Sequence, residues 1–129
     1  MAHDHRVLIV EDDYAFRWSL AIRFQRRGVD TDVAENVREA CDLIGRDAEY
    51  CCVLLDLGLP SIGGEKVLDA IEAHPRKSPV LVVTGYPDAW QRVAAMPQAA
   101  FVRRAMIKPV EVDAVVNEAL SHCSVASRN

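Results

Sequence analysis

The sequence predicts an α/β protein in which a parallel β-sheet carries helices on both faces. Short runs rich in Val, Leu and Ile alternate with longer segments whose apolar residues recur at helical spacing. Two of these runs, 50–55 and 79–84, lack polar alternation, which is typical of strands that are covered on both faces. Alternating strands and helices favour a doubly wound parallel sheet with right-handed crossovers.

The first unit combines a strand-like run with an amphipathic segment. The run 6–10 is rich in β-branched residues and predicts a strand. The segment 13–27 predicts a helix, because Phe16, Leu20 and Phe24 recur every fourth residue and therefore share one face.

The second unit has a more polar strand than the first. Gly28 separates it from the first helix and suits a left-handed cap. Residues 29–34 alternate apolar and polar side chains, as an edge strand does, and a helix is expected over 36–46.

The last three units follow the same scheme, with proline or glycine in the turns between elements. Pro60 and Gly63 are expected to form the turn after the third strand. Strands are predicted at 50–55, 79–84 and 105–107, and helices at 64–74, within 88–96 and from Pro109 to about 122.

Length and composition fit one ordinary globular domain. The 129 residues are expected to form a single domain over 1–129, with its core at about 6–122 and a tail over 123–129. The formal net charge of −4 argues against nucleic-acid binding through overall charge, because that mode needs many Lys and Arg residues.

The N-terminal residues and the cysteines favour a cytoplasmic protein. No apolar stretch approaches the roughly 20 residues of a membrane span, and the first residues do not resemble a secretory signal. The four cysteines have neither metal-ligand spacing nor the pattern of a small secreted domain. We therefore expect buried, reduced thiols. They stand at positions 41, 51, 52 and 123.

Polar residues follow four of the five predicted strands. In an open parallel sheet, ligands bind outside the carboxyl ends of the strands. Each polar residue also has an ordinary explanation, such as helix capping by Asp13 or a turn, but their shared edge favours one common site. They are Glu11, Asp12 and Asp13 after the first strand, Asp56 after the third, Thr84 after the fourth and Lys108 after the fifth.

These groups suit phosphoryl chemistry. Three carboxylates repel one another unless a hard cation neutralises them, and Mg²⁺ prefers oxygen ligands. A carboxylate beside Mg²⁺ can attack phosphorus and form an aspartyl phosphate. A lysine ammonium and a threonine hydroxyl can then hold the phosphoryl oxygens.

Four motifs together resemble the receiver domain of bacterial two-component response regulators, and the match covers nearly the whole chain. The resemblance implies a flavodoxin-like (βα)5 fold with strand order 2-1-3-4-5. It also implies that a sensor histidine kinase or a histidine phosphotransfer protein donates a phosphoryl group to Asp56, which switches contacts with an unknown downstream protein. The motifs are "LIVEDD", "LLDLGLPSIGGEKVL", "VLVVTG" and "MIKP".

The resemblance implies a metal site around the phosphoacceptor Asp56. Asp12 matches a direct Mg²⁺ ligand, and Glu11 matches an acid that acts mainly through water. Gly58 matches the position whose backbone carbonyl completes the metal site.

The resemblance also assigns the groups that bind the phosphoryl oxygens. Thr84 matches the switch hydroxyl and Lys108 matches the lysine that pairs with the phosphoryl group. The bond from Lys108 to Pro109 is then expected to be cis, which proline tolerates better than other residues.

The chain departs from the receiver pattern between Thr84 and Lys108. Ala105 stands where these domains often carry a switch Tyr or Phe, and the stretch is about two residues longer than usual. Arg103 and Arg104 are either a partner-binding patch or a solvated pair. Tyr86 borders the predicted site, and we expect it to shield the phosphoryl group from water.

Other functions fit the residues less well. A haloacid-type phosphatase has an Asp-x-Asp nucleophile after its first strand, and a dinucleotide-binding domain needs a Gly-rich turn there, whereas this chain has Glu11-Asp12-Asp13. We therefore expect no enzyme activity and no direct nucleic-acid or membrane binding. A homodimer is one form expected for the phosphorylated chain. The remaining alternative is a receiver-fold interaction module that acts without phosphorylation.

Overall fold

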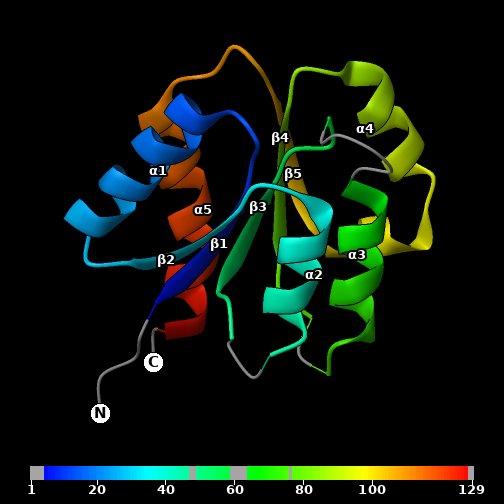
Figure 1. Cartoon of the computed structure of the whole chain (residues 1–129), viewed down its shortest axis with the longest axis horizontal. Coiled ribbons are helices and arrows are strands. Elements are labelled where there is room, and N and C mark those ends of the chain that lie inside the picture. Colours follow the sequence, from blue (N-terminus) through cyan, green and yellow to red (C-terminus); the bar gives the residue numbers. More distant parts are fainter. Residues whose placement is uncertain (1–4, 47–48, 59–63, 76, 128–129) are drawn as a thin grey trace.

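The protein is a single five-stranded parallel sheet with helices on both faces, as the sequence predicts. The computed structural model describes residues 5–46, 49–58, 64–75 and 77–127. The strand order is β2-β1-β3-β4-β5, which confirms the expected flavodoxin-like order (Figure 1). The strands are β1 (Arg6–Val10), β2 (Asp30–Ala34), β3 (Cys52–Leu55), β4 (Val80–Thr84) and β5 (Val102–Ile107).

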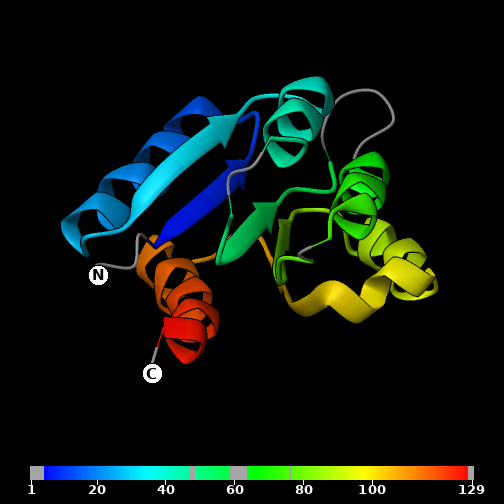
Figure 2. The same cartoon turned by 90° about the horizontal axis from the view of Figure 1, so that it is seen from below.

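The helices form two outer layers. Helices α1 and α5 cover one face of the sheet, and α2, α3 and α4 lie on the other, as Figures 1 and 2 show. No helix within the described ranges is both long and apolar enough to cross a lipid bilayer. The helices are α1 (Tyr14–Arg26), α2 (Val37–Ile44), α3 (Gly64–Ala73), α4 (Pro87–Ala94) and α5 (Val112–Ser127), with a 3₁₀ turn over Pro97–Phe101.

The alternation of strand side chains divides the core between these layers. On the α1/α5 face, Leu20 and Phe24 pack beside Val115. On the other face, Val67 and Leu68 of α3 pack against strand residues of the opposite parity. Strands β3 and β4 are buried along their whole length, as their continuous apolar runs predict.

Helix caps position the loop that follows β1. The Asp13 side chain accepts a hydrogen bond from the Phe16 amide at 3.2 Å, so Asp13 caps α1 as expected. Gly28 has a φ of +77°, which confirms the left-handed conformation expected after this helix. The expected turn at Pro60 and Gly63 lies outside the described residues.

Strand β5 is longer than the sequence predicts. It covers Val102–Ile107 rather than 105–107, because Arg103 and Arg104 are exposed side chains of an edge strand, whose pattern is less apolar than that of a central strand. Its pairing with β4 passes from Val102 to Arg104, so Arg103 is an extra residue. This irregularity and the preceding 3₁₀ turn accommodate the lengthened stretch.

Helix α5 extends beyond the expected end of the core. It continues to Ser127, although the sequence predicts a tail from 123. Cys123 lies four residues after Ala119 and is buried on the same face, so the helix continues to contribute to the core at this point. The expectation of a tail over 123–129 is therefore wrong as far as Ser127, where the chain is still helical.

The expectation of reduced thiols is also wrong for two cysteines. Cys51, which precedes β3, and Cys123 of α5 form a disulfide, whereas Cys41 and Cys52 are free. The two bonded residues are separated by 72 positions in the sequence, so their spacing gave no sign that their Cα atoms lie 4.9 Å apart.

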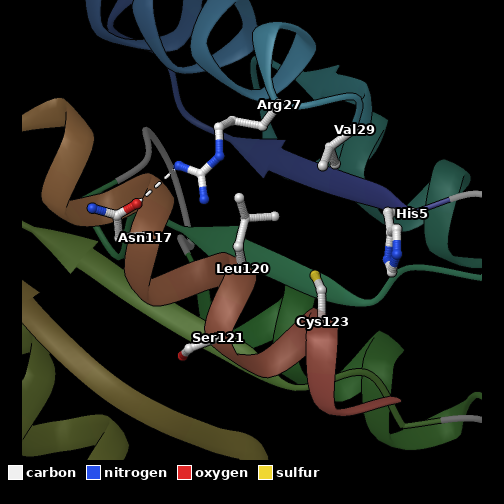
Figure 3. A pocket seen from close by; sticks show the side chains of 7 residues that line it. All are labelled: His5, Arg27, Val29, Asn117, Leu120, Ser121 and Cys123. Atoms are coloured by element: carbon white, nitrogen blue, oxygen red, sulfur yellow. Dashed lines mark hydrogen bonds between the residues drawn. The ribbon is translucent and has the colours of Figure 1, made fainter. Parts of the chain in front are cut away.

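Cys123 also borders a hollow of about 390 Å³ between α1 and α5, which Arg27 and Asn117 line as well (Figure 3).

Candidate functional site

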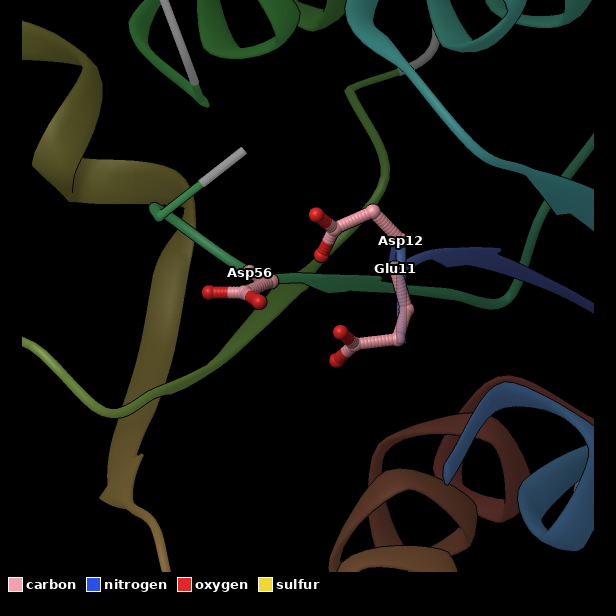
Figure 4. A group of neighbouring side chains, drawn as sticks. All are labelled: Glu11, Asp12 and Asp56. Atoms are coloured by element: carbon pink, nitrogen blue, oxygen red, sulfur yellow. The ribbon is translucent and has the colours of Figure 1, made fainter. Parts of the chain in front are cut away.

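Three carboxylates meet at the carboxyl edge of the sheet. Glu11 and Asp12 follow β1, and Asp56 follows β3 (Figure 4). One ligand atom from each lies within 4.8 Å of the others. Glu11 is 3% exposed and Asp56 is 6% exposed, whereas Asp12 faces solvent. The fold thus brings together the acids that the sequence analysis selected, in a group that can hold a cation.

Lys108 provides the positive charge in this group. Its ammonium donates to Glu11 Oε1 at 3.0 Å and to Asp56 Oδ2 at 3.3 Å. Its backbone amide donates to the Thr84 carbonyl at 2.8 Å, which fixes the end of β5 against β4. The bond between Lys108 and Pro109 is cis, as expected.

Thr84 and Gly58 lie around the same edge. The Thr84 side chain is fully buried, and its hydroxyl accepts a hydrogen bond from the Tyr86 amide at 3.2 Å. The Gly58 amide donates to Asp56 Oδ1 at 2.9 Å, which holds one carboxylate oxygen in place.

Tyr86 covers Gly58. A Cβ atom added to Gly58 would overlap the Tyr86 ring, so the absence of a side chain at residue 58 lets the ring approach the backbone beside Asp56. The Tyr86 side chain is nevertheless 59% exposed, so the ring forms an outer wall of the site rather than part of the core.

Burial and charge change the titration of two site residues. Burial raises the pKa of Glu11 to about 7, and the Asp56 charge adds to this rise. The Asp13 amide and Lys108 oppose it. Burial lowers the pKa of Lys108, but its bonds and attraction to Glu11 and Asp56 outweigh burial and leave that pKa raised. The lysine therefore stays charged while Glu11 titrates near neutrality.

This titration predicts that the metal-free protein loses stability as pH rises from 4.5 to about 7. Folded Glu11 keeps its proton up to about pH 7, whereas the unfolded carboxyl releases it near 4.5, so the folded state binds more protons within this window. We expect the melting temperature to fall by a few degrees across it, measured by circular dichroism without divalent cations.

The matched variant for this measurement is Glu11→Gln. It removes the titrating group but keeps the side-chain length, so its melting temperature should change less over the same window. If the wild-type melting temperature instead rises by a few degrees through this pH window, the raised pKa assigned to Glu11 is contradicted. Added Mg²⁺ should reduce the fall, because a cation favours the ionised carboxylate.

Two residues of α1 contribute to the site although the sequence analysis did not select them. The Phe16 ring centroid lies 4.9 Å from the Lys108 ammonium, a cation–π contact. Arg17 is 9% exposed, and its guanidinium donates to the Glu11 carbonyl at 3.0 Å. The helical spacing places Phe16 on the apolar face of the helix and does not indicate a contact with the site. The sequence contains one signal for Arg17, because an arginine on the apolar face of a helix needs a polar partner.

The residues that depart from the receiver pattern have separate environments. Ala105 packs with Phe101 against the core on the α3 side. Arg104 forms an ion pair with Glu118 of α5 at 2.8 Å, and Arg103 is exposed. Arg104 is therefore partly engaged within the chain, whereas the exposure of Arg103 agrees with both interpretations, a partner-binding patch and a solvated side chain.

The fold and this site define a receiver domain, the phosphoacceptor module of two-component signalling. The family model for the response regulator receiver domain matches residues 7–119. The chain therefore belongs to the response regulator receiver domain family.

Individual relatives agree with this assignment. The regulatory protein AtoC of Escherichia coli is 33% identical over 109 residues, which are 84% of this chain and 23% of AtoC. The Francisella response regulator 1452 receiver domain has a TM-score of 0.80 at 19% identity, covering 96% of this chain and 100% of that one. The response regulator TrrA from Thermotoga maritima, in complex with Mg(2+)-BeF, has a TM-score of 0.74 at 23% identity, covering 92% and 98%.

The chain corresponds to only part of the curated relatives. It covers 23% of AtoC and 41% of the response regulator MprA from Mycolicibacterium vanbaalenii. What these relatives share with the chain is the receiver domain.

Proposed function

We propose that this receiver domain takes a phosphoryl group from a phosphohistidine onto Asp56 and passes the signal on through altered protein contacts. The observation that carries the proposal is the position of Asp56. This buried carboxylate directly follows the central strand, β3, and contacts Lys108 at 3.3 Å. Phosphorylation-independent signalling is the less favoured alternative, because it gives no role to an aspartate that is held between a lysine and two further acids.

The chain's residues suit the transfer step. An Asp56 oxygen attacks phosphorus, the phosphorus–nitrogen bond of the donor breaks, and the imidazole leaves with the electron pair and takes up a proton. The Lys108 ammonium contacts the Asp56 carboxylate and is positioned to bind a phosphoryl oxygen once negative charge lies on that oxygen. The Thr84 hydroxyl, which accepts from the Tyr86 amide, can donate a hydrogen bond to the same phosphoryl group.

The acidic group suits Mg²⁺. Asp12 and Asp56 would bind the ion directly with the Gly58 carbonyl, and Glu11 would act through water, in keeping with the all-oxygen donor set that Mg²⁺ prefers. Bound there, the ion supplies charge that draws phosphoryl oxygens toward a cluster of carboxylates. The Mg(2+)-BeF complex of TrrA supports this assignment by similarity.

The proposal extends to partners and location. The donor is a sensor histidine kinase or a histidine phosphotransfer protein, and the output is a protein contact rather than turnover of a substrate. Tyr14 and Trp18 expose aromatic surface on α1, beside the loop that carries Asp12, where a protein donor can pack. We propose a cytoplasmic setting, no direct binding to nucleic acid or membrane, and a homodimer as one form of the phosphorylated chain.

The direct test is intact-mass spectrometry after incubation with acetyl phosphate and Mg²⁺. A single phosphoryl adduct supports the proposal. Omission of the metal, or its chelation, should prevent the adduct. If neither a small donor nor a purified histidine kinase domain yields an adduct, the interaction-module alternative gains support.

A second expected result concerns Tyr86 and the lifetime of the phosphoryl group. Its ring lies against Gly58 next to Asp56, on the open side of the site. Tyr86→Ala should expose the phosphoryl group to water and speed its loss by roughly threefold to tenfold, a barrier change of about 1 kcal/mol. Tyr86→Phe keeps the ring and should decay at the wild-type rate. The rate is measured as the loss of the mass adduct with time. Equal rates for all three proteins would show that the ring does not shield the phosphoryl group from water.

A further inference from the structure

Arg17 is a buried cation that the proposed phosphoryl transfer does not use. Its side chain is 11% exposed, and the carboxylate of Glu35, its ion-pair partner, lies 3.9 Å away and is largely exposed. Its guanidinium also lies 5.4 Å from the Tyr14 ring centroid. Burying a charge in this way is costly unless hydrogen bonds compensate for the lost water. The position therefore needs a local reason.

The local reason is a backbone carbonyl. Arg17 Nη1 donates to the Glu11 carbonyl at 3.0 Å, and this bond is buried. That carbonyl belongs to the peptide that joins Glu11 to Asp12, the first two acids of the site. Since a peptide group is planar, holding its oxygen also fixes the direction in which the chain enters Asp12.

The preceding peptide, which joins Val10 to Glu11, is held by a strand. The Glu11 amide donates to the Ala34 carbonyl of β2 at 3.0 Å. The Asp13 amide donates to Glu11 Oε2 at 3.0 Å, and Asp13 caps α1. Arg17 thus supplies the hydrogen bond at the one peptide between the two acids, and it does so from the helix that Asp13 starts.

We propose that Arg17 is a positioning residue for the metal site, which sets the direction of Asp12 through the Glu11 carbonyl. The inference rests on the proposed function, because it assumes that the acidic group binds Mg²⁺. Arg17 touches neither the ion nor the phosphoryl group. Its effect passes through the backbone.

A purely electrostatic role for Arg17 predicts the opposite result. If Arg17 only neutralised the acids, its removal would make the site more negative and would tighten cation binding. If Arg17 positions the Glu11–Asp12 peptide, its removal frees a buried carbonyl and weakens cation binding, because partners that orient metal ligands typically change affinity by about 10–100-fold. The sign of the change therefore separates the two roles.

The test compares Arg17→Met, Arg17→Gln and Arg17→Lys with Arg26→Met. Arg26 is an exposed arginine of the same helix, so Arg26→Met removes the same charge without touching the Glu11 carbonyl. Mg²⁺ affinity is measured by isothermal titration calorimetry on the folded proteins. Exchange of the Asp12 and Asp13 amides is measured by NMR without metal.

Positioning predicts that Arg17→Met weakens Mg²⁺ binding by roughly tenfold and speeds exchange of these amides. Arg17→Lys, which keeps a charged donor, should recover most of the affinity, and Arg26→Met should bind at least as tightly as wild type. If Arg17→Met does not fold, Arg17→Gln makes the same comparison, because it is also neutral.

Tighter or unchanged Mg²⁺ binding in the neutral Arg17 variants would overturn the inference, and so would amide exchange equal to that of Arg26→Met. Failure of the proposed function is a separate outcome. In that case the wild-type protein itself binds no Mg²⁺, and the exchange measurement on the metal-free proteins still decides whether Arg17 holds the peptide.

Discussion

Asp56→Asn is expected to abolish the phosphoryl adduct that the wild-type protein forms with acetyl phosphate and Mg²⁺. The amide that replaces the carboxylate has no anionic oxygen to attack phosphorus, and its nitrogen cannot take over this role. Neither neighbouring acid compensates, because Glu11 is buried against Lys108 and Asp12 faces solvent after a different strand. Intact-mass spectrometry measures the loss directly.

The variant should lose the adduct without losing the fold. In the metal-free protein burial raises the pKa of Glu11, and repulsion from the Asp56 charge adds to this rise. Removing one charge relieves this repulsion, so Asp56→Asn should melt at or above the wild-type temperature. Asp42→Asn removes an exposed carboxylate of α2 and should keep the adduct. An adduct that persists on Asp56→Asn would place the phosphoacceptor elsewhere.

The central strands were predictable because their environment is simple. Strands β3 and β4 are covered on both faces, so nearly every residue is apolar and the run itself marks the strand. Strand β5 lies at the edge of the sheet, where Arg103 and Arg104 can remain solvated within the strand. Hydrophobicity alone therefore found only its last three residues.

The acidic group was predictable for a topological reason. In a parallel sheet the carboxyl ends of all strands meet at one edge, so residues that are far apart in sequence can be assigned to one site once the strands are known. Glu11, Asp56 and Lys108 can be assigned in this way, because each directly follows a strand.

Side chains that approach the site from a helix cannot be assigned in this way. Phe16 and Arg17 lie in the first turns of α1, and helical periodicity shows only that they face inward. Whether an inward residue meets the core, the lysine that follows β5 or a backbone carbonyl depends on how the helix packs on the sheet. That geometry is set by tertiary contacts, which the local pattern does not contain.

The disulfide was missed for a related reason. Cys51 precedes β3 and Cys123 lies in the last turns of α5, so only the packing of α5 across the sheet brings them together. The spacing of cysteines is informative when a local motif fixes their geometry, as in metal sites. Here a long-range contact fixes it.

Reduction of the Cys51–Cys123 disulfide is expected to destabilise the protein strongly. The bond closes a loop with a sequence separation of 72, and restricting an unfolded chain to such a loop is worth about 4 kcal/mol in the chain-entropy description. For a domain of this size the melting temperature should fall on the order of 10 °C when the bond is reduced. Thermal unfolding with and without a thiol reductant measures the difference.

Thiol counts and activity separate this effect from damage to the site. After unfolding, the oxidised protein should react with alkylating reagent at Cys41 and Cys52 only, and the reduced protein at all four cysteines. Cys51→Ser should reproduce the reduced melting temperature, whereas Cys41→Ser should not. Phosphoryl acceptance should persist in each folded protein, because Cys51 and Asp56 lie at opposite ends of β3. Equal melting temperatures before and after reduction would mean that α5 is held to β3 by packing alone.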